Sequence, residues 1–78
     1  MNANEIRQLA AEVLAGIAPE ADLSGVGDGE DLRQALDLDS MDFLNFVVAL
    51  NERTGIAIPE ADMPKLFTLK GLLAYLAR

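Results

Sequence analysis

Cysteine and histidine are both absent from this chain of 78 residues. The first absence excludes disulfides and thiolate nucleophiles, the second excludes imidazole bases, and together they remove the common zinc ligands. A serine nucleophile needs a base to take its proton, and histidine is the usual one. The composition therefore predicts that the chain is not an enzyme and has no metal site of its own.

Aromatic residues are scarce as well, with three phenylalanines and one tyrosine. The core must therefore be built from Leu, Ile, Val and Ala, with Phe43, Phe46 and Phe67 as its bulkiest side chains. A chain of this length can form one modest core, so we expect a single domain over residues 1–78.

The chain also lacks long apolar runs and has few positively charged residues. No window approaches the roughly 20 apolar residues that span a bilayer, and no N-terminal run resembles a signal peptide, so we expect a soluble cytoplasmic protein. The net charge of −7 argues against binding to nucleic acid or to an anionic membrane, because both need positive charge. A basic protein partner fits better, and we expect the chain itself to be a monomer.

The negative charge is concentrated in one stretch. Residues 20–42 contain eight acidic residues against Arg33 alone, which leaves −7, so the rest of the chain is neutral. One interpretation is a solvated acidic loop, which is common in small soluble proteins. The other is a surface that attracts a basic partner.

The spacing of apolar residues predicts helices and single helical turns. In chain order these cover residues 3–17, 31–36 (one turn), 40–53, 60–63 (one turn, limited by Pro64) and 69–77. The stretch from Pro19 to Leu38 is long for a structureless loop in a small domain. We expect it to be ordered and held to the core by its apolar residues, which are Leu23, Val26, Leu32 and Leu36.

Capping residues mark the helix ends. Asn2, with Glu5 three residues on, is suited to begin the first helix, and Thr68 is suited to begin the last. Gly55 is suited to the left-handed conformation that closes the helix over 40–53. Gly71 lies inside the last helix, where glycine costs about 1 kcal/mol relative to alanine.

Two apolar stripes run along the helix expected over residues 40–53. The first is sufficient for a core and contains Phe43, Phe46, Val47 and Leu50. The second lies beside it and contains Met41, Leu44 and Val48. Either this helix is buried on most sides, or the second stripe is partly exposed and contacts a partner, since an apolar patch beside an acidic rim is typical of an interaction site.

Ser40 lies where the acidic loop meets this helix. As a structural residue it would be the N-cap, but Asp39 can fill that position equally well. With Asp39 as the cap, Asp42 falls at the third helical position, where its charge suits the helix dipole, and the Ser40 hydroxyl is turned outward. An attached phosphodiester at Ser40 would then lie at the positive end of the helix.

The run Asp39-Ser40-Met41 resembles the Asp-Ser-Leu signature that begins the second of four helices in the acyl carrier proteins. The resemblance extends to residues 55–59 after that helix, which read Gly-Ile-Ala-Ile-Pro, and to residues 68–75 in the last one. It implies an all-α fold, namely a small four-helix bundle with a long first loop and a short third helix, forming one carrier domain.

The resemblance also implies that Ser40 receives a 4′-phosphopantetheine arm from coenzyme A, added by a separate phosphopantetheinyl transferase that needs magnesium. The thiol at the end of the arm would hold acyl intermediates as thioesters for delivery to partner enzymes. The reactive sulfur would then belong to the attached cofactor, which accounts for the absence of cysteine from the chain.

Two further groups of residues take their roles from the resemblance. Residues implied to meet basic patches on acyl-loading and acyl-using enzymes are Asp39, Met41, Asp42, Leu44, Val48 and Glu52. Residues that match the positions lining a shelter for the acyl chain are Val47, Leu50, Ile58, Met63, Leu66 and Leu72. Taken one at a time, the residues of the second group are better described as ordinary core.

The chain also departs from the family. Carriers of fatty acid synthesis usually have acidic residues where this chain has Asn45, Asn51, Ala61 and Pro64. We therefore expect a dedicated carrier that serves one pathway, such as fatty acid or polyketide synthesis, rather than the housekeeping carrier. Two alternatives stay open: an aminoacyl or peptidyl carrier, and a helical adaptor protein without a cofactor.

Overall fold

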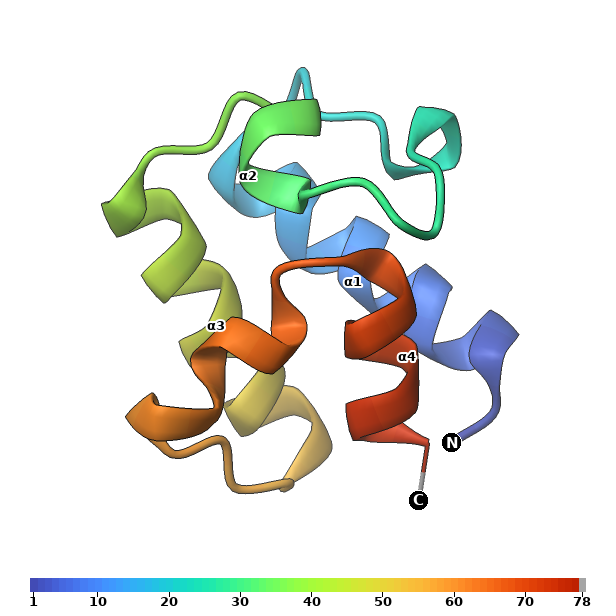
Figure 1. Cartoon of the computed structure of the whole chain (residues 1–78), viewed down its shortest axis with the longest axis vertical. Helices are drawn as coiled ribbons and strands as arrows, with labels where there is room; N and C mark the ends of the chain where they lie inside the picture. Colours follow the sequence, from blue (N-terminus) through green and yellow to red (C-terminus); the bar gives the residue numbers. More distant parts are fainter. Residues whose placement is uncertain (78) are drawn as a thin grey trace.

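The computed structural model describes residues 1–77 and contains helices joined by loops (Figure 1). In chain order the elements are α1 (Ala3–Ile17), the 3₁₀ helix η1 (Leu23–Gly25), α2 (Leu32–Ala35), α3 (Ser40–Thr54), the 3₁₀ helix η2 (Glu60–Leu66) and α4 (Leu69–Leu76). No strand is assigned in this part of the chain, where the one β-type contact is an isolated bridge. The predicted all-α bundle is confirmed, with α1, α3, η2 and α4 as its four main helices, a long first loop and a short third helix.

The helix ends follow the predicted capping residues. Asn2 and Glu5 form a reciprocal capping box at the start of α1, and the Thr68 hydroxyl accepts a hydrogen bond from the Gly71 amide at 3.0 Å. Gly55 closes α3 with φ +73°, a left-handed conformation that an L side chain rarely adopts. These local signals explain why each of the longer helices begins or ends within one residue of its expected position.

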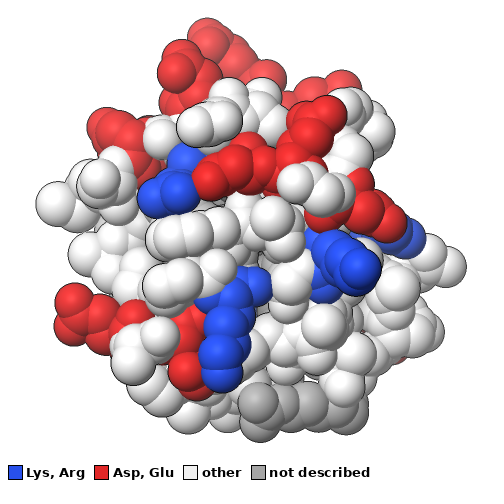
Figure 2. Space-filling model, in the orientation of Figure 1, with Lys and Arg blue, Asp and Glu red and all other residues white. Residues whose placement is uncertain are grey.

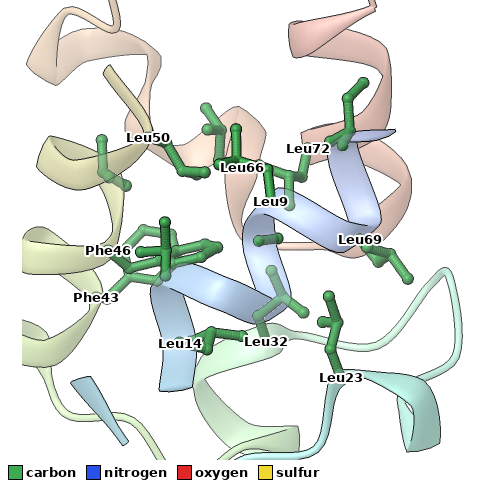
Figure 3. Close-up of a cluster of buried hydrophobic side chains, with 14 of the residues drawn as sticks. Leu9, Leu14, Leu23, Leu32, Phe43, Phe46, Leu50, Leu66, Leu69 and Leu72 are labelled. Atoms are coloured by element: carbon green, nitrogen blue, oxygen red, sulfur yellow. The ribbon is translucent and has the colours of Figure 1, made fainter. Parts of the chain in front are cut away.

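The core lies where α1, α3, η2 and α4 converge (Figure 3). α1 contacts both α3 and α4, and η2 packs against α4. The side chains without exposed surface are Ile6, Ala10, Leu32, Phe46, Leu50, Leu66, Leu72 and Leu76. Burial of this apolar surface is the main source of stability in a domain without disulfides.

The long loop is fixed by main-chain hydrogen bonds to the segment that begins α4. The Leu32 amide donates to the Phe67 carbonyl oxygen at 2.7 Å, and the Lys70 amide donates to the Asp28 carbonyl oxygen at 2.9 Å. Leu23 and Leu32 are buried, while Val26 is half-buried. The expectation of an ordered loop held by its apolar residues is therefore confirmed, and Figure 1 shows this loop and α2 covering one end of the bundle.

Arg33 adds side-chain contacts to the same junction. Its guanidinium donates to both carboxylate oxygens of Asp31, at 3.1 and 2.7 Å, and lies 3.6 Å from the ring centroid of Phe67. The Phe67 ring meets Phe43 of α3 edge-on at 5.2 Å. The Arg33 hydrogen bonds hold the pKa of Asp31 below its ordinary value of 3.8, and Asp31 in turn raises the pKa of Arg33.

Two short elements differ from the sequence expectation. The turn expected over 60–63 continues as η2 through Leu66, so the prediction that Pro64 limits it was wrong. Proline has a fixed φ that suits this helix and removes only one amide donor, and η2 is held from outside by the Tyr75 hydroxyl, which donates to Asp62 at 2.8 Å. The helix η1 was not expected; its Asp22 carboxylate accepts from the amide and hydroxyl of Ser24.

Gly71 is needed at a close approach of η2 to α4. A Cβ atom at this position would overlap the backbone carbonyl oxygen of Lys65, which cannot rotate away. We predict that Gly71→Ala destabilises the fold by about 1–3 kcal/mol, as measured by urea unfolding, although alanine is the better helix former.

Gly16 of α1 provides the matched control. A Cβ atom there would meet nothing within 4 Å, so Gly16→Ala should leave stability unchanged or raise it by up to about 1 kcal/mol. Equal effects of the two substitutions would contradict the packing explanation for Gly71.

The Asp31–Arg33 pair predicts a pH-dependent contribution to stability. The pKa of Asp31 is lower in the folded state, so the contribution is present above the unfolded-state pKa of about 3.9 and is lost as the pH falls through the folded-state value. Asp31→Asn keeps a side-chain oxygen for the cap but removes the charge. The urea midpoints of the two proteins should differ at neutral pH and converge in acid; a constant difference would contradict this.

Candidate functional site

The loop between α2 and α3 places Ser40 at the first position of α3. Leu38 is buried, and its amide donates to the Arg33 carbonyl oxygen at 2.8 Å, which anchors the loop two residues before the serine. Asp37 has φ +53°, a left-handed conformation that few residues other than glycine adopt. A buried anchor and a sharp turn therefore set the direction in which α3 starts.

Asp39 is the N-cap of α3, as the sequence predicted. Its carboxylate accepts a hydrogen bond from the Asp42 amide at 2.7 Å, and its carbonyl accepts from the Phe43 amide at 3.0 Å. Ser40 is exposed, and its hydroxyl makes no hydrogen bond to any residue in the range 1–77. The prediction that the Ser40 hydroxyl is turned outward and not needed as a cap is confirmed.

A groove begins at Ser40 and runs between α3 and η2; we call it the α3–η2 groove. It has a volume of about 450 Å³, and its lining residues are Ser40, Leu44, Val47, Val48, Asn51, Ile58, Glu60 and Met63. From Ser40 to Asn51 it follows α3 for eleven residues, or about 16 Å at the helical rise of about 1.5 Å per residue. A group attached to Ser40 therefore has an apolar channel directly beside it.

The second apolar stripe of α3 is exposed. The side chains of Met41, Leu44 and Val48 are 62%, 42% and 45% exposed, and within the described part of the chain the other exposed large hydrophobic residue is Met1. The polar residues expected beside them are also accessible, since Asp39 and Glu52 are exposed and Asp42 is half-buried. We call these six residues the docking face; contact with a partner there stays a prediction.

The acids of the docking face lack internal counter-charges. The ion pairs found within residues 1–77 use Glu12, Asp28, Asp31 and Asp62, which all lie outside this face. Figure 2 shows further acidic side chains gathered over the end of the molecule where Figure 1 places α2 and the loop before it. The acids of the docking face are therefore available to a basic partner, and the acidic end of the molecule adds to the negative potential that attracts it.

The six residues expected to line an acyl shelter fall into two groups. Val47, Ile58 and Met63 line the α3–η2 groove. Leu50, Leu66 and Leu72 have no exposed surface and lie in the core (Figure 3). Three of the six expected residues therefore line the groove, and the other three belong to the core.

Two polar lining residues of the groove were missed by sequence reasoning. Asn51 lies three residues after Val48 on α3, a spacing that could have placed it on the groove side. Its amide nitrogen donates to the Ile56 carbonyl oxygen at 2.7 Å, which fixes its orientation. Glu60 reaches the groove only because η2 folds back against α3, and no periodic signal indicates that.

No helix among residues 1–77 is long and apolar enough to cross a membrane. Because the chain has no histidine or cysteine, a metal ion would have to be held by acidic side chains. Among residues 1–77, no three of these side chains are grouped in a way that could hold one.

Comparison with known proteins agrees with the geometry of the site. Residues 4–76 match the family model described as a phosphopantetheine attachment site. The chain is 33% identical over 72 residues to an acyl carrier protein of Campylobacter hominis, covering 92% of this chain and 85% of that protein. It is 30% identical over 71 residues to polyketide-8 synthase acyl carrier protein 2 of Streptomyces avermitilis, covering 91% of this chain and 76% of that protein.

Such proteins are carriers rather than catalysts, and they interact with the enzymes that modify them and handle their acyl groups. Their 4′-phosphopantetheine is attached covalently and supplies the thiol that forms the thioester. An exposed, unbonded serine hydroxyl at a helix start beside an apolar groove fits such a group. The chain therefore belongs to the acyl carrier protein family, as a phosphopantetheine-attachment domain over residues 4–76.

Proposed function

We propose that Ser40 is the attachment residue and that the chain carries acyl thioesters for a dedicated biosynthetic pathway. The observation that carries the proposal is the state of the Ser40 side chain, which is exposed and unbonded because Asp39 already caps α3. The chain has one other serine, Ser24, and its hydroxyl is engaged with Asp22 at 2.6 Å. Ser40 is therefore the serine hydroxyl open to modification.

The start of α3 is suited to the phosphodiester that the modification would leave. In the transfer, Ser40 Oγ forms a bond to the phosphorus of coenzyme A that bears the pantetheine chain, the hydroxyl proton goes to solvent or to a base of the transferase, and adenosine 3′,5′-bisphosphate departs. The amides of Ser40 and Met41 have no acceptor within residues 1–77. These two amides could donate hydrogen bonds to the phosphodiester, and the positive end of the helix dipole would stabilise its negative charge.

The docking face supports recognition by enzymes with basic surface patches. Its exposed apolar centre, formed by Met41, Leu44 and Val48, offers area to bury, while its unpaired acids attract and orient a basic partner. The phosphopantetheinyl transferase must approach Ser40 and would contact this face first. Acyl-loading and acyl-using enzymes would use the same surface, because the arm that ends in the thioester is attached to the same serine.

A dedicated pathway fits the surface better than a housekeeping role. Four positions that are usually acidic in carriers of fatty acid synthesis are Asn45, Asn51, Ala61 and Pro64 here, and Asn51 is held by Ile56 rather than offered to a partner. The similarity to an acyl carrier protein and to a polyketide synthase acyl carrier protein supports acyl cargo over an aminoacyl or peptidyl cargo. It also disfavours the adaptor without a cofactor.

Modification of Ser40 can be tested by intact mass. We expect incubation with coenzyme A, magnesium and a broad-specificity phosphopantetheinyl transferase to add the mass of one phosphopantetheine group. Ser40→Ala should gain nothing, whereas Ser24→Ala should be modified like the natural protein, since Ser24 serves only the turn at η1. No gain in the natural protein, while a known carrier is modified alongside it, would favour the adaptor.

Measuring the stability of two variants at the start of α3 tests whether Ser40→Ala loses modification without losing the fold. Asp39→Ala removes the carboxylate that accepts from the Asp42 amide and should cost about 1 kcal/mol in urea unfolding. Ser40→Ala removes an unbonded hydroxyl and should cost well under that amount. A Ser40→Ala loss as large as that of Asp39→Ala would mean that Ser40 is structural.

The docking face predicts a defect in transfer without a defect in stability. Val48 is about half exposed, so covering it by a partner is worth about 1 kcal/mol, and Val48→Ser should lower kcat/KM of the transferase for this carrier about five-fold. Ala11→Ser, at an exposed position of α1, is the control and should leave kcat/KM unchanged. The proposal fails if the two variants behave alike.

A further inference from the structure

The three methionines of the chain differ in how far solvent reaches them. Met41 is 62% exposed and Met1 is 39% exposed, whereas Met63 is half-buried and packs against the core. Methionine sulfur is oxidised to the sulfoxide where an oxidant can reach it, and a chain without cysteine has no thiol that would react first. Met41 is therefore the methionine most open to oxidants.

Met41 also lies directly beside the proposed attachment residue. It is the second residue of α3, after Ser40, and helical side chains lean toward the N-terminal end of their helix. Its side chain therefore covers surface at the end of α3 where a transferase must approach the Ser40 hydroxyl. Figure 1 places the N-terminus of the chain on the opposite side of the molecule from the start of α3. A chemical change at Met41 thus alters the surface that a partner would cover first.

Oxidation of Met41 would make the centre of the docking face polar. Met41 forms this apolar centre together with Leu44 and Val48. The sulfoxide oxygen is a hydrogen-bond acceptor on a side chain that was apolar, and burying it against an apolar partner surface leaves it without a donor. The fold itself buries only a minor part of Met41 and would lose little. Recognition is therefore more sensitive to this oxidation than stability is.

We propose that Met41 is an oxidation site and that its sulfoxide switches off recognition by enzymes that bind the docking face. The oxidant is a hydroperoxide: the Met41 sulfur forms a bond to one peroxide oxygen, the O–O bond breaks, and the proton of the transferred oxygen passes to the departing oxygen. The sulfur loses two electrons, and hydrogen peroxide is reduced to water or an organic hydroperoxide to its alcohol. Enzymes can reduce methionine sulfoxide again, so the switch is reversible. This inference rests on the proposed function and adds a regulation that it does not include.

The test oxidises the protein before Ser40 is modified. The natural protein is treated with hydrogen peroxide, the peroxide is destroyed with catalase, and coenzyme A, magnesium and a broad-specificity phosphopantetheinyl transferase are then added. Fragment mass spectrometry should find the added oxygen at Met41 before it appears at Met63. We expect kcat/KM of the transferase for the oxidised carrier to fall about ten-fold. The change should lie mainly in KM, because Met41 would be covered by the partner without touching the reacting atoms.

Two leucine variants separate the effect of Met41 from that of the other methionines. Leucine is close to methionine in volume and has no sulfur. Met63→Leu leaves Met41 and Met1 oxidisable and should show the same fall after peroxide treatment, whereas Met41→Leu leaves Met63 and Met1 and should show none. Each protein is compared with its own untreated form, so a different starting kcat/KM in either variant does not affect the result. Reductases for both sulfoxide epimers should restore kcat/KM of the natural protein.

The outcomes separate the inference from the proposed function. No mass gain from the transferase in any untreated protein would overturn attachment at Ser40 and the inference with it. Normal modification of the untreated proteins, with an unchanged kcat/KM after oxidation of Met41, would overturn the inference alone. An equal fall in Met41→Leu would do the same. So would a large drop in the urea midpoint on oxidation of the natural protein, since the effect on kcat/KM would then be structural.

Discussion

The hydrogen bond from the Asp42 amide to the Asp39 carboxylate determines what the rest of the site can do. Every helix start leaves amide donors without partners, and a side chain must satisfy some of them. A serine at this boundary would ordinarily be used for that purpose. Because Asp39 caps the helix one residue earlier, α3 begins at Ser40 and the hydroxyl of this serine is left unbonded.

The direction of α3 depends in turn on contacts that are distant in sequence. The loop before Ser40 is held by main-chain hydrogen bonds from Leu32 to Phe67 and from Lys70 to Asp28, and by the stacking of Arg33 on Phe67. These contacts join the loop to the start of α4, the helix against which η2 packs. The serine and the wall of the groove beside it are therefore positioned by one junction.

Periodicity and capping residues were enough to predict α1, α3, α4 and the free serine, because those signals act within a few residues of each other. They could not predict η2, where Pro64 is tolerated because contacts to α4 hold the turn, nor the need for Gly71, which arises from the approach of Lys65. Nor could they predict which of the expected acyl-shelter residues line the groove and which lie in the core. Leu50 and Val47 belong to the same apolar stripe, and only the packing of η2 decides which of them faces the groove.

α3 presents three surfaces that differ in what they can tolerate. Its core side, with Phe46 and Leu50, is closed, so changes there cost stability before they affect recognition. Its outward side, with Met41, contributes little to the folded state because this side chain remains mostly in water. Between them lies the groove, whose residues contact both core and solvent. The exposed side of this helix can therefore change without loss of the fold, while the shape of the groove is tied to the packing of η2.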